Sequence, residues 1–137
     1  MDAALEGADA VIDATSSPSI SPDETREYFG TTTRNLLAAE ERAGVRHHHH
    51  VLLSIVGIHR MGGGTAHYSG KREQERLVEE GRVPWTIVPA TQFHDFAALA
   101  TSWTERDGVA TIAPLLIQPI APDGIARVLA EVATGEP

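Results

Sequence analysis

The sequence predicts an α/β fold, in which a partial, doubly wound parallel sheet is covered by helices. Two observations carry this prediction. Short apolar runs, such as residues 8–15 and 51–56, are typical of strands that are buried on both faces. Segments with helical spacing of apolar residues alternate with these runs along the chain. The 137 residues suffice for one domain with a buried core, and no internal repeat or domain boundary is evident.

The first third of the chain is expected to hold a strand and a long helix. Residues 2–7 resemble the last turn of a helix that a glycine ends, and residues 8–15 (ADAVIDAT) form the first strand. After a turn-rich loop, residues 21–24 (SPDE) place serine at a helix cap, proline in the first turn and glutamate three residues after the cap. We therefore predict a helix over residues 22–43, with Gly44 as its stop.

The middle third repeats this pattern. Residues 51–56 (VLLSIV) are a second continuous apolar strand, and residues 57–65 form a glycine-containing loop after it. A polar helix is predicted over residues 66–80, with Gly81 as its stop.

The last third is less regular. Residues 85–88 (WTIV) predict a third strand, and a short helix is expected near residues 95–103. Residues 109–112 and 115–120 are short strand candidates on either side of a proline. The final helix is predicted over residues 122–133, where four apolar side chains recur at helical spacing: Ile125, Val128, Leu129 and Val132.

Composition narrows the class of partners. The net charge of -8 disfavours a nucleic-acid partner, because a phosphate backbone attracts basic surfaces. Without cysteine there is no disulfide and no thiol chemistry, which fits a reducing compartment. No apolar run reaches the roughly 20 residues that a membrane helix needs. We therefore expect a cytoplasmic protein with a small-molecule substrate, no nucleic-acid partner and no membrane contact.

Four consecutive histidines at residues 47–50 raise the question of a metal site. Successive residues of a strand point to opposite faces, so the four rings cannot converge on one ion. We interpret the run as a lengthened loop before the second strand and predict no metal site.

Several segments resemble a known family in their order and spacing. The chain is similar to atypical short-chain dehydrogenases/reductases, and in particular to their NmrA-like, NAD(P)H-binding group. The resemblance covers nearly the whole chain and rests on residues 33–39 (TRNLLAA), 43–47 (AGVRH), 51–54 (VLLS), 84–88 (PWTIV), 90–93 (ATQF) and 118–120 (QPI).

This resemblance implies a Rossmann-like fold and an NAD or NADP cofactor, with NADP slightly preferred. In parallel sheets of this type, ligands bind beyond the carboxyl ends of the strands. The resemblance places the adenosine and pyrophosphate near the first strand end, at Asp13, Ala14, Thr15 and Ser16. It places Ser54 beside the nicotinamide and the substrate. It lines the nicotinamide pocket with four residues after the third strand: Ala90, Thr91, Gln92 and Phe93.

The family's reductases use a tyrosine four residues before a lysine on one helix face. The positive charge of the lysine favours the phenolate, so that tyrosine can exchange a proton with the substrate oxygen. The lysine also bonds the nicotinamide ribose. Here Lys71 is present, but Tyr68 lies three residues before it and His67 four. We take Ser54, Tyr68 and Lys71 as candidate catalytic residues, with His67 as an alternative acid/base.

Two further positions depart from the family pattern. Extended members of the family commonly have an asparagine near the position of Phe29, where it helps to build a proton relay. Close relatives often have arginine at the position of Pro89. Both departures weaken the case for a complete reductase site.

The glycine-rich turn that opens a dinucleotide fold is missing from the sequence. No G-x-G-x-x-G pattern occurs, and the three glycines at residues 62–64 have the wrong spacing. We therefore expect residues 1–137 to form a single, incomplete NAD(P)-binding-like domain that lacks the first strands. In the strand order 3-2-1-4-5-6, residues 8–15 would then lie at a bare sheet edge and favour self-association.

The resemblance, together with the missing glycine-rich turn, leaves three functions open. The first is part of an NAD(P)H-dependent oxidoreductase that acts on a small carbonyl-type substrate, active once the missing unit is supplied. The second is a non-enzymatic dinucleotide sensor or regulatory binding protein. The third is a truncated remnant that binds no ligand.

Overall fold

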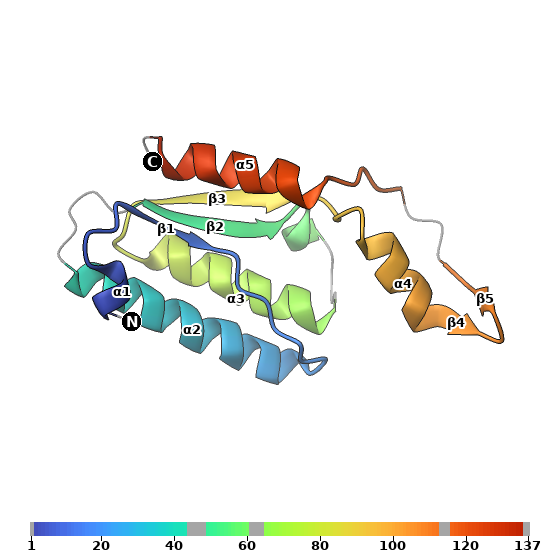
Figure 1. Cartoon of the computed structure of the whole chain (residues 1–137). Helices are drawn as coiled ribbons and strands as arrows, with labels where there is room; N and C mark the ends of the chain where they lie inside the picture. Colours follow the sequence, from blue (N-terminus) through green and yellow to red (C-terminus); the bar gives the residue numbers. More distant parts are fainter. Residues whose placement is uncertain (1, 44–48, 61–64, 113–115, 136–137) are drawn as a thin grey trace.

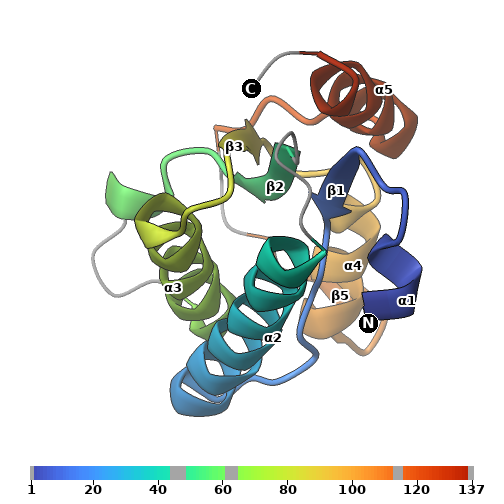
Figure 2. The same cartoon turned by 90° about the vertical axis from the view of Figure 1, so that its left-hand side faces the viewer.

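The structure, a computed structural model, describes residues 2–43, 49–60, 65–112 and 116–135. Its centre is a three-stranded parallel sheet in the order β1–β2–β3: β1 (Ala10–Asp13), β2 (His49–Ile55) and β3 (Trp85–Ala90). Two helices, α2 (Pro22–Arg42) and α3 (Ala66–Glu80), cover one face, and α5 (Pro122–Ala133) covers the other (Figure 1 and Figure 2). The predicted α/β class with a parallel sheet is confirmed.

The sheet is buried on both faces because side chains of β2 alternate between two cores. Leu52 is fully buried against the α2–α3 layer, in a cluster with Leu37, Val78 and Val83. Its neighbour Val51 is fully buried on the opposite face, in a cluster with Ala90, Ile125 and Leu129 beneath α5. Alternation along a strand thus explains the continuous apolar run in the sequence.

Both long helices begin at the caps that the sequence provides. The Ser21 hydroxyl accepts a hydrogen bond from the backbone N–H of Glu24, and the Thr65 hydroxyl accepts one from the backbone N–H of Tyr68. Each cap satisfies a backbone donor that would otherwise have no partner within the helix. The predicted spans of α2 and α3 agree with the structure, whereas Gly44 and residues 62–64 lie outside the described residues.

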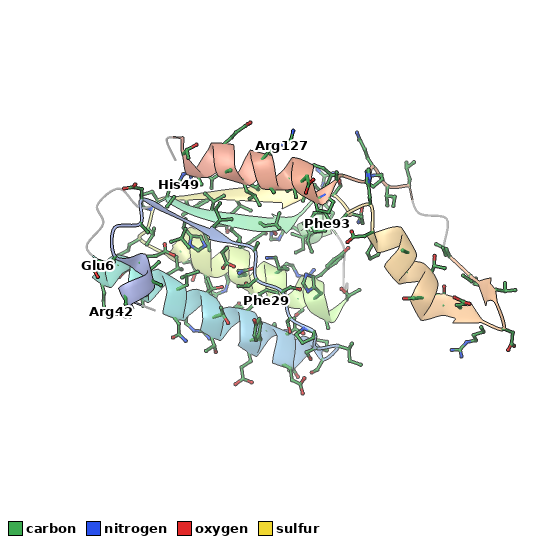
Figure 3. The ribbon with its side chains drawn as sticks, in the orientation of Figure 1. Glu6, Phe29, Arg42, His49, Phe93 and Arg127 are labelled. Carbon is green, nitrogen blue, oxygen red and sulfur yellow. The ribbon has the colours of Figure 1, made fainter. Side chains whose placement is uncertain are left out.

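Helices α2 and α3 approach each other closely at Gly70. A Cβ atom added there would lie 2.3 Å from Cδ2 of Phe29 and 2.8 Å from the backbone oxygen of Thr25. Phe29 is fully buried at this contact (Figure 3). The absence of a side chain at Gly70 is therefore what allows the two helices to pack at this distance.

The interpretation of the histidine run as a loop was wrong for its last two residues. His49 and His50 are buried residues of β2, while residues 44–48 lie outside the described part. Both rings have polar partners: His49 Nε2 lies 2.7 Å from Thr86 Oγ1, and His50 Nδ1 lies 3.0 Å from Glu40 Oε1. These partners allow histidine to stand in a buried strand. Among the described residues, no group of three His, Cys, Asp or Glu residues could hold a metal ion.

The C-terminal third differs most from the predicted elements. Helix α4 (Phe96–Thr104) leads into an antiparallel hairpin, β4 (Glu105–Arg106) and β5 (Val109–Ala110), and together they extend beyond the strand ends (Figure 1). The hairpin turn holds Asp107 and Gly108 at φ 52° and 76°, as a tight two-residue turn requires. Strand β4 was not predicted, because two residues carry no periodic signal.

The strand predicted over residues 115–120 was also wrong. In the described part, residues 116–119 have no regular structure, and Ile120 forms a single bridge with Phe93. The backbone N–H of Ile120 donates to the Gln92 oxygen, and His94 donates to the Ile120 oxygen. Pro119 has no N–H to extend the ladder. The final helix, by contrast, has the predicted bounds, although Val128 is 39% exposed.

Within the described residues, β1 pairs only with β2 and so lies at one edge of the sheet, with Ile12 45% exposed. A single-turn helix, α1 (Asp2–Leu5), precedes it and ends before Gly7, which has a φ of 77°. No helix in the described part is long and apolar enough to cross a membrane.

Candidate functional site

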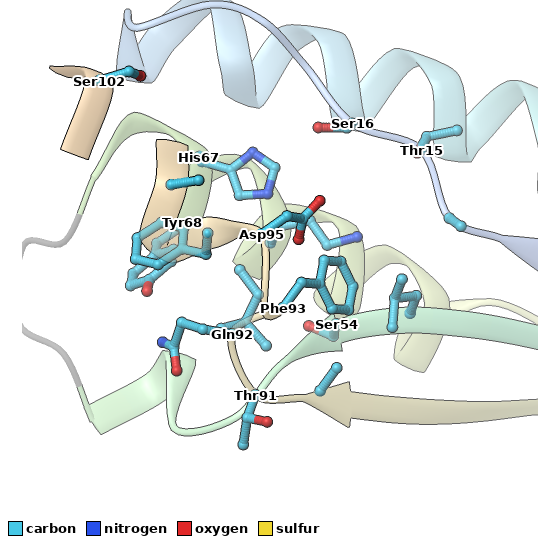
Figure 4. Close-up of a pocket in the computed structure, with 17 residues that line it drawn as sticks. Thr15, Ser16, Ser54, His67, Tyr68, Thr91, Gln92, Phe93, Asp95 and Ser102 are labelled. Atoms are coloured by element: carbon cyan, nitrogen blue, oxygen red, sulfur yellow. The ribbon is translucent and has the colours of Figure 1, made fainter. Parts of the chain in front are cut away.

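A cavity of about 700 Å³ lies at the carboxyl ends of the three strands (Figure 4). This volume is in the usual range for small-molecule and cofactor sites. All but one of the predicted site residues line it: Ala14, Thr15, Ser16, Ser54, Tyr68, Lys71, Ala90, Thr91, Gln92 and Phe93. The topology explains this, because the carboxyl ends of parallel strands meet at one edge of a sheet.

Asp13 is the exception among the predicted cofactor-binding residues. It is 1% exposed and stands behind the cavity wall instead of in it. Its Oδ1 accepts a hydrogen bond from the backbone N–H of Thr15 at 3.0 Å, and its Oδ2 accepts one from Gln74 Nε2 at 2.7 Å. Asp13 therefore fixes the backbone of Thr15, which does line the cavity.

Among the cavity-lining residues that the structure describes, Ser54, near the end of β2, is the one whose polar group is buried without a described partner. The side chain is 3% exposed, and its Oγ has no hydrogen-bond partner in the described residues. A buried polar group without a partner is costly, commonly about 1–3 kcal/mol. A ligand oxygen or nitrogen in the cavity would remove this cost. The residues present thus fit a polar ligand at this point.

Lys71 projects from α3 toward the same cavity and is 4% exposed. Its Nζ donates to Gln74 Oε1 and lies 5.2 Å from the centre of the Phe29 ring. Burial lowers the pKa of Lys71 to about 8, because a charged ammonium group loses solvation there, while the charges of Asp13 and Glu75 act in the opposite direction. At neutral pH most of the Lys71 side chains remain charged.

His67 and Tyr68 both line the cavity from the first turn of α3, ahead of Lys71. In the view of Figure 4, His67 lies on the side of Ser16 and Tyr68 on the side of Gln92. Successive helical residues differ in direction by about 100°, which separates the two side chains. The His67 ring packs edge-on against Phe29, with 5.5 Å between ring centres. Burial and the nearby charge of Lys71 lower the pKa of His67, so the neutral imidazole is favoured.

The far wall of the cavity comes from residues that sequence reasoning missed. Helix α4 and the loop before it contribute Asp95, Phe96, Ala98 and Ser102. Leu53 and Ile55, on either side of Ser54, complete the apolar lining. The position of α4 depends on how the chain turns after β3, and no local motif in the sequence specifies that turn.

The sequence profile of a family described as NAD(P)H-binding matches residues 1–136. The chain belongs to this NAD(P)H-binding family. The cofactor class of this family is a nicotinamide dinucleotide. In parallel sheets of this type, ligands bind beyond the carboxyl ends of the strands, which is where the cavity lies.

One solved structure is similar in fold. It is a putative NAD-dependent epimerase/dehydratase from Bacillus halodurans, with a TM-score of 0.68 and 20% sequence identity, and the match covers 97% of this chain. The chain spans 61% of the length of that protein. No curated protein is similar enough in sequence to count as a relative. The structural match supports a Rossmann-like fold for this chain.

Proposed function

We propose that the chain provides the nicotinamide side of an NAD(P)H site in an oxidoreductase of the NmrA-like, atypical short-chain dehydrogenase/reductase type. The substrate in this proposal is a small carbonyl-type compound, and NADP(H) is slightly preferred over NAD(H). The observation that carries the proposal is the buried Ser54 hydroxyl, which has no hydrogen-bond partner among the described residues and lines the same cavity as the buried Lys71 side chain.

The proposed roles follow from the chemistry of each side chain. When bound, the cofactor supplies or accepts the hydride. Ala90, Thr91, Gln92 and Phe93 line the nicotinamide pocket, and Ala14, Thr15 and Ser16 follow the path toward the adenosine side. The Ser54 hydroxyl donates a hydrogen bond to the substrate oxygen and orients it.

Tyr68 and Lys71 are the proposed proton-transfer pair. Residues three apart on a helix lie close enough for their side chains to interact. Tyr68 then exchanges a proton with the substrate oxygen, and Lys71 also binds the nicotinamide ribose. Most of the cavity surface is formed by apolar atoms, which strengthens electrostatic interactions inside it.

Titration of the purified chain with NADPH and with NADH, by isothermal calorimetry, tests the proposal. We expect saturable binding that Lys71→Met weakens by about tenfold, as the loss of a charge-assisted hydrogen bond predicts. Arg127→Met is the matched control, because Arg127 is exposed on α5, on the opposite face of the sheet (Figure 3). If neither nucleotide binds, or if both variants weaken binding equally, the proposal is wrong for this chain.

A second candidate function is a dinucleotide sensor without catalysis. Its specific support is that His67, not a tyrosine, stands four residues before Lys71, and that its ring packs on Phe29. One assay, which measures both NAD(P)H binding and NAD(P)H oxidation, distinguishes the two functions. A sensor binds NAD(P)H saturably but oxidises none of it with a panel of small aldehydes and ketones, whereas an oxidoreductase gives turnover that Ser54→Ala reduces.

The proposal also covers the cellular location and the self-association of the protein. We propose a cytoplasmic location, because a sequence without cysteine fits a reducing compartment. We also propose self-association through the β1 edge, where Ile12 is 45% exposed.

A further inference from the structure

Gln74 lies at the centre of a buried polar network beneath the cavity. It stands on α3, one turn after Lys71, and its side chain is fully buried. Its Oε1 accepts a hydrogen bond from Lys71 Nζ at 2.5 Å. Its Nε2 donates to Asp13 Oδ2 at 2.7 Å and to Thr15 Oγ1 at 3.2 Å. One amide group therefore connects α3 with the end of β1.

The chemistry of its partners fixes the orientation of this amide. An ammonium group only donates, so it must face Oε1, and an ionised carboxylate only accepts, so it must face Nε2. Glutamate has the same shape but cannot donate to Asp13, and methionine can replace neither bond. A primary amide is thus the side-chain chemistry that satisfies Lys71 and Asp13 together.

The two connected elements both contribute to the wall of the cavity. Lys71 and Thr15 both line it, whereas Gln74 and Asp13 do not. Asp13 also accepts a hydrogen bond from the backbone N–H of Thr15 at 3.0 Å. The network therefore holds Thr15, in the loop after β1, by its backbone as well as by its hydroxyl group. A shift of Gln74 would move the ammonium group and this loop relative to each other.

We propose that Gln74 is a positioning residue, which holds the Lys71 ammonium group and the loop at Thr15 in a fixed relation to each other in the wall of the cofactor cavity. The inference rests on the proposed function of the cavity as an NAD(P)H site. Gln74 does not touch the cavity itself and acts through its two neighbours.

The charge state of Lys71 gives a direct readout of this role. The charged or titratable groups that act on Lys71 are Asp13 from β1 and Glu75 and His67 from α3. Gln74 adds a neutral acceptor, which favours the ammonium form. Lys71 is the only lysine in the sequence, so its side-chain NMR signals are unambiguous. Its pKa can be measured in the chain without cofactor.

The experiment compares four variants of the full chain by this titration: Gln74→Met, Gln74→Glu, Gln74→Glu with Asp13→Asn, and Gln118→Glu. Gln118→Glu is the matched control, since it makes the same chemical change at an exposed position. We expect Gln74→Met to lower the pKa of Lys71 by about 1, the equivalent of one charge-assisted hydrogen bond. Gln74→Glu should raise it, and the control should leave it unchanged.

The double variant is the decisive arm, because it exchanges donor and acceptor while preserving shape and net charge. The new amide nitrogen at position 13 would donate to the new carboxylate at position 74. The amide oxygen at position 13 would still accept from the backbone N–H of Thr15. We expect the double variant to bring thermal stability and NADPH affinity back to within about threefold of wild type, whereas Gln74→Glu alone loses at least about tenfold in affinity.

Two results would overturn the inference. One is a Lys71 pKa that does not change in any Gln74 variant, and the other is a double variant that is no better than Gln74→Glu alone. If Gln74→Met does not fold, the two isosteric variants still decide the question. Failure of the wild-type chain to bind NADPH counts against the proposed function, while the cofactor-free titration and the stability of the double variant test Gln74 independently.

Discussion

Gly70→Ala tests the close contact between α2 and α3 most directly. The added methyl carbon would lie 2.3 Å from Phe29 Cδ2, 2.5 Å from Thr25 Cγ2 and 2.8 Å from the Thr25 backbone oxygen. All three distances are below normal van der Waals contact, and one neighbour is backbone, which cannot rotate away. Overpacking of this kind costs about 1–3 kcal/mol, and we place Gly70→Ala at the upper end. Alanine gains about 1 kcal/mol over glycine in helix propensity. We expect a net loss of about 2 kcal/mol.

Gly30→Ala is the matched control for this substitution. It makes the same change in α2, but the nearest atom to the new methyl group is the end of the flexible Arg34 side chain, at 3.1 Å. The helix-propensity gain should then dominate, and stability should stay the same or rise by up to about 1 kcal/mol. Urea denaturation followed by circular dichroism measures both variants. Equal stability of the two variants would refute the argument that Gly70 sets the helix–helix distance.

Three further predictions concern buried charge and the sheet edge. Glu40→Ala should cost about 1–3 kcal/mol in urea denaturation, because it leaves the buried His50 ring without its carboxylate partner; a loss below about 0.5 kcal/mol would contradict this. Between pH 8 and 10.5, stability should rise with pH, because Lys71 releases its proton near pH 8 in the folded chain but near 10.5 when unfolded, so that the unfolded state binds more protons. The full effect is about 3 kcal/mol, and a Lys71→Met variant that keeps the same slope would rule out this source. Ile12→Lys, on the exposed β1 edge, should reduce self-association in sedimentation velocity, and a wild-type chain that is monomeric at all concentrations would exclude the edge contact.

The positions of the main helices and of most site residues could be predicted from the sequence, for identifiable physical reasons. Helix starts at Ser21 and Thr65 follow from side-chain caps, which are local. Ser54 and residues 90–93 reach the cavity because the strands that carry them are parallel, so their carboxyl ends share one edge. These inferences need only local pattern and sheet direction.

The burial and the partners of several polar residues could not be predicted, because they depend on contacts between residues far apart in the sequence. Gln74 stands in a strongly polar helix segment, where a solvated surface position is the natural expectation, yet it is fully buried against Asp13, 61 residues away. His50 is buried for a similar reason, because Glu40 lies within reach on the neighbouring helix. Asp13 was expected at the cofactor, but its two oxygens are used within the protein. Hydrogen bonds between such distant side chains leave no periodic pattern in the sequence from which they could be predicted.

One face of the sheet is covered by a single helix, α5, which is synthesised after all three strands of the sheet. In the described structure, α5 is the element that packs over Val51 and Ala90, whereas α2 and α3 cover the other face. During synthesis, all three strands and both helices of the first layer emerge before residues 122–133 do. Until then, one apolar face of the sheet remains open to water and to other chains. Packing of α5 over Val51 and Ala90 therefore removes this apolar face from contact with water and with other chains.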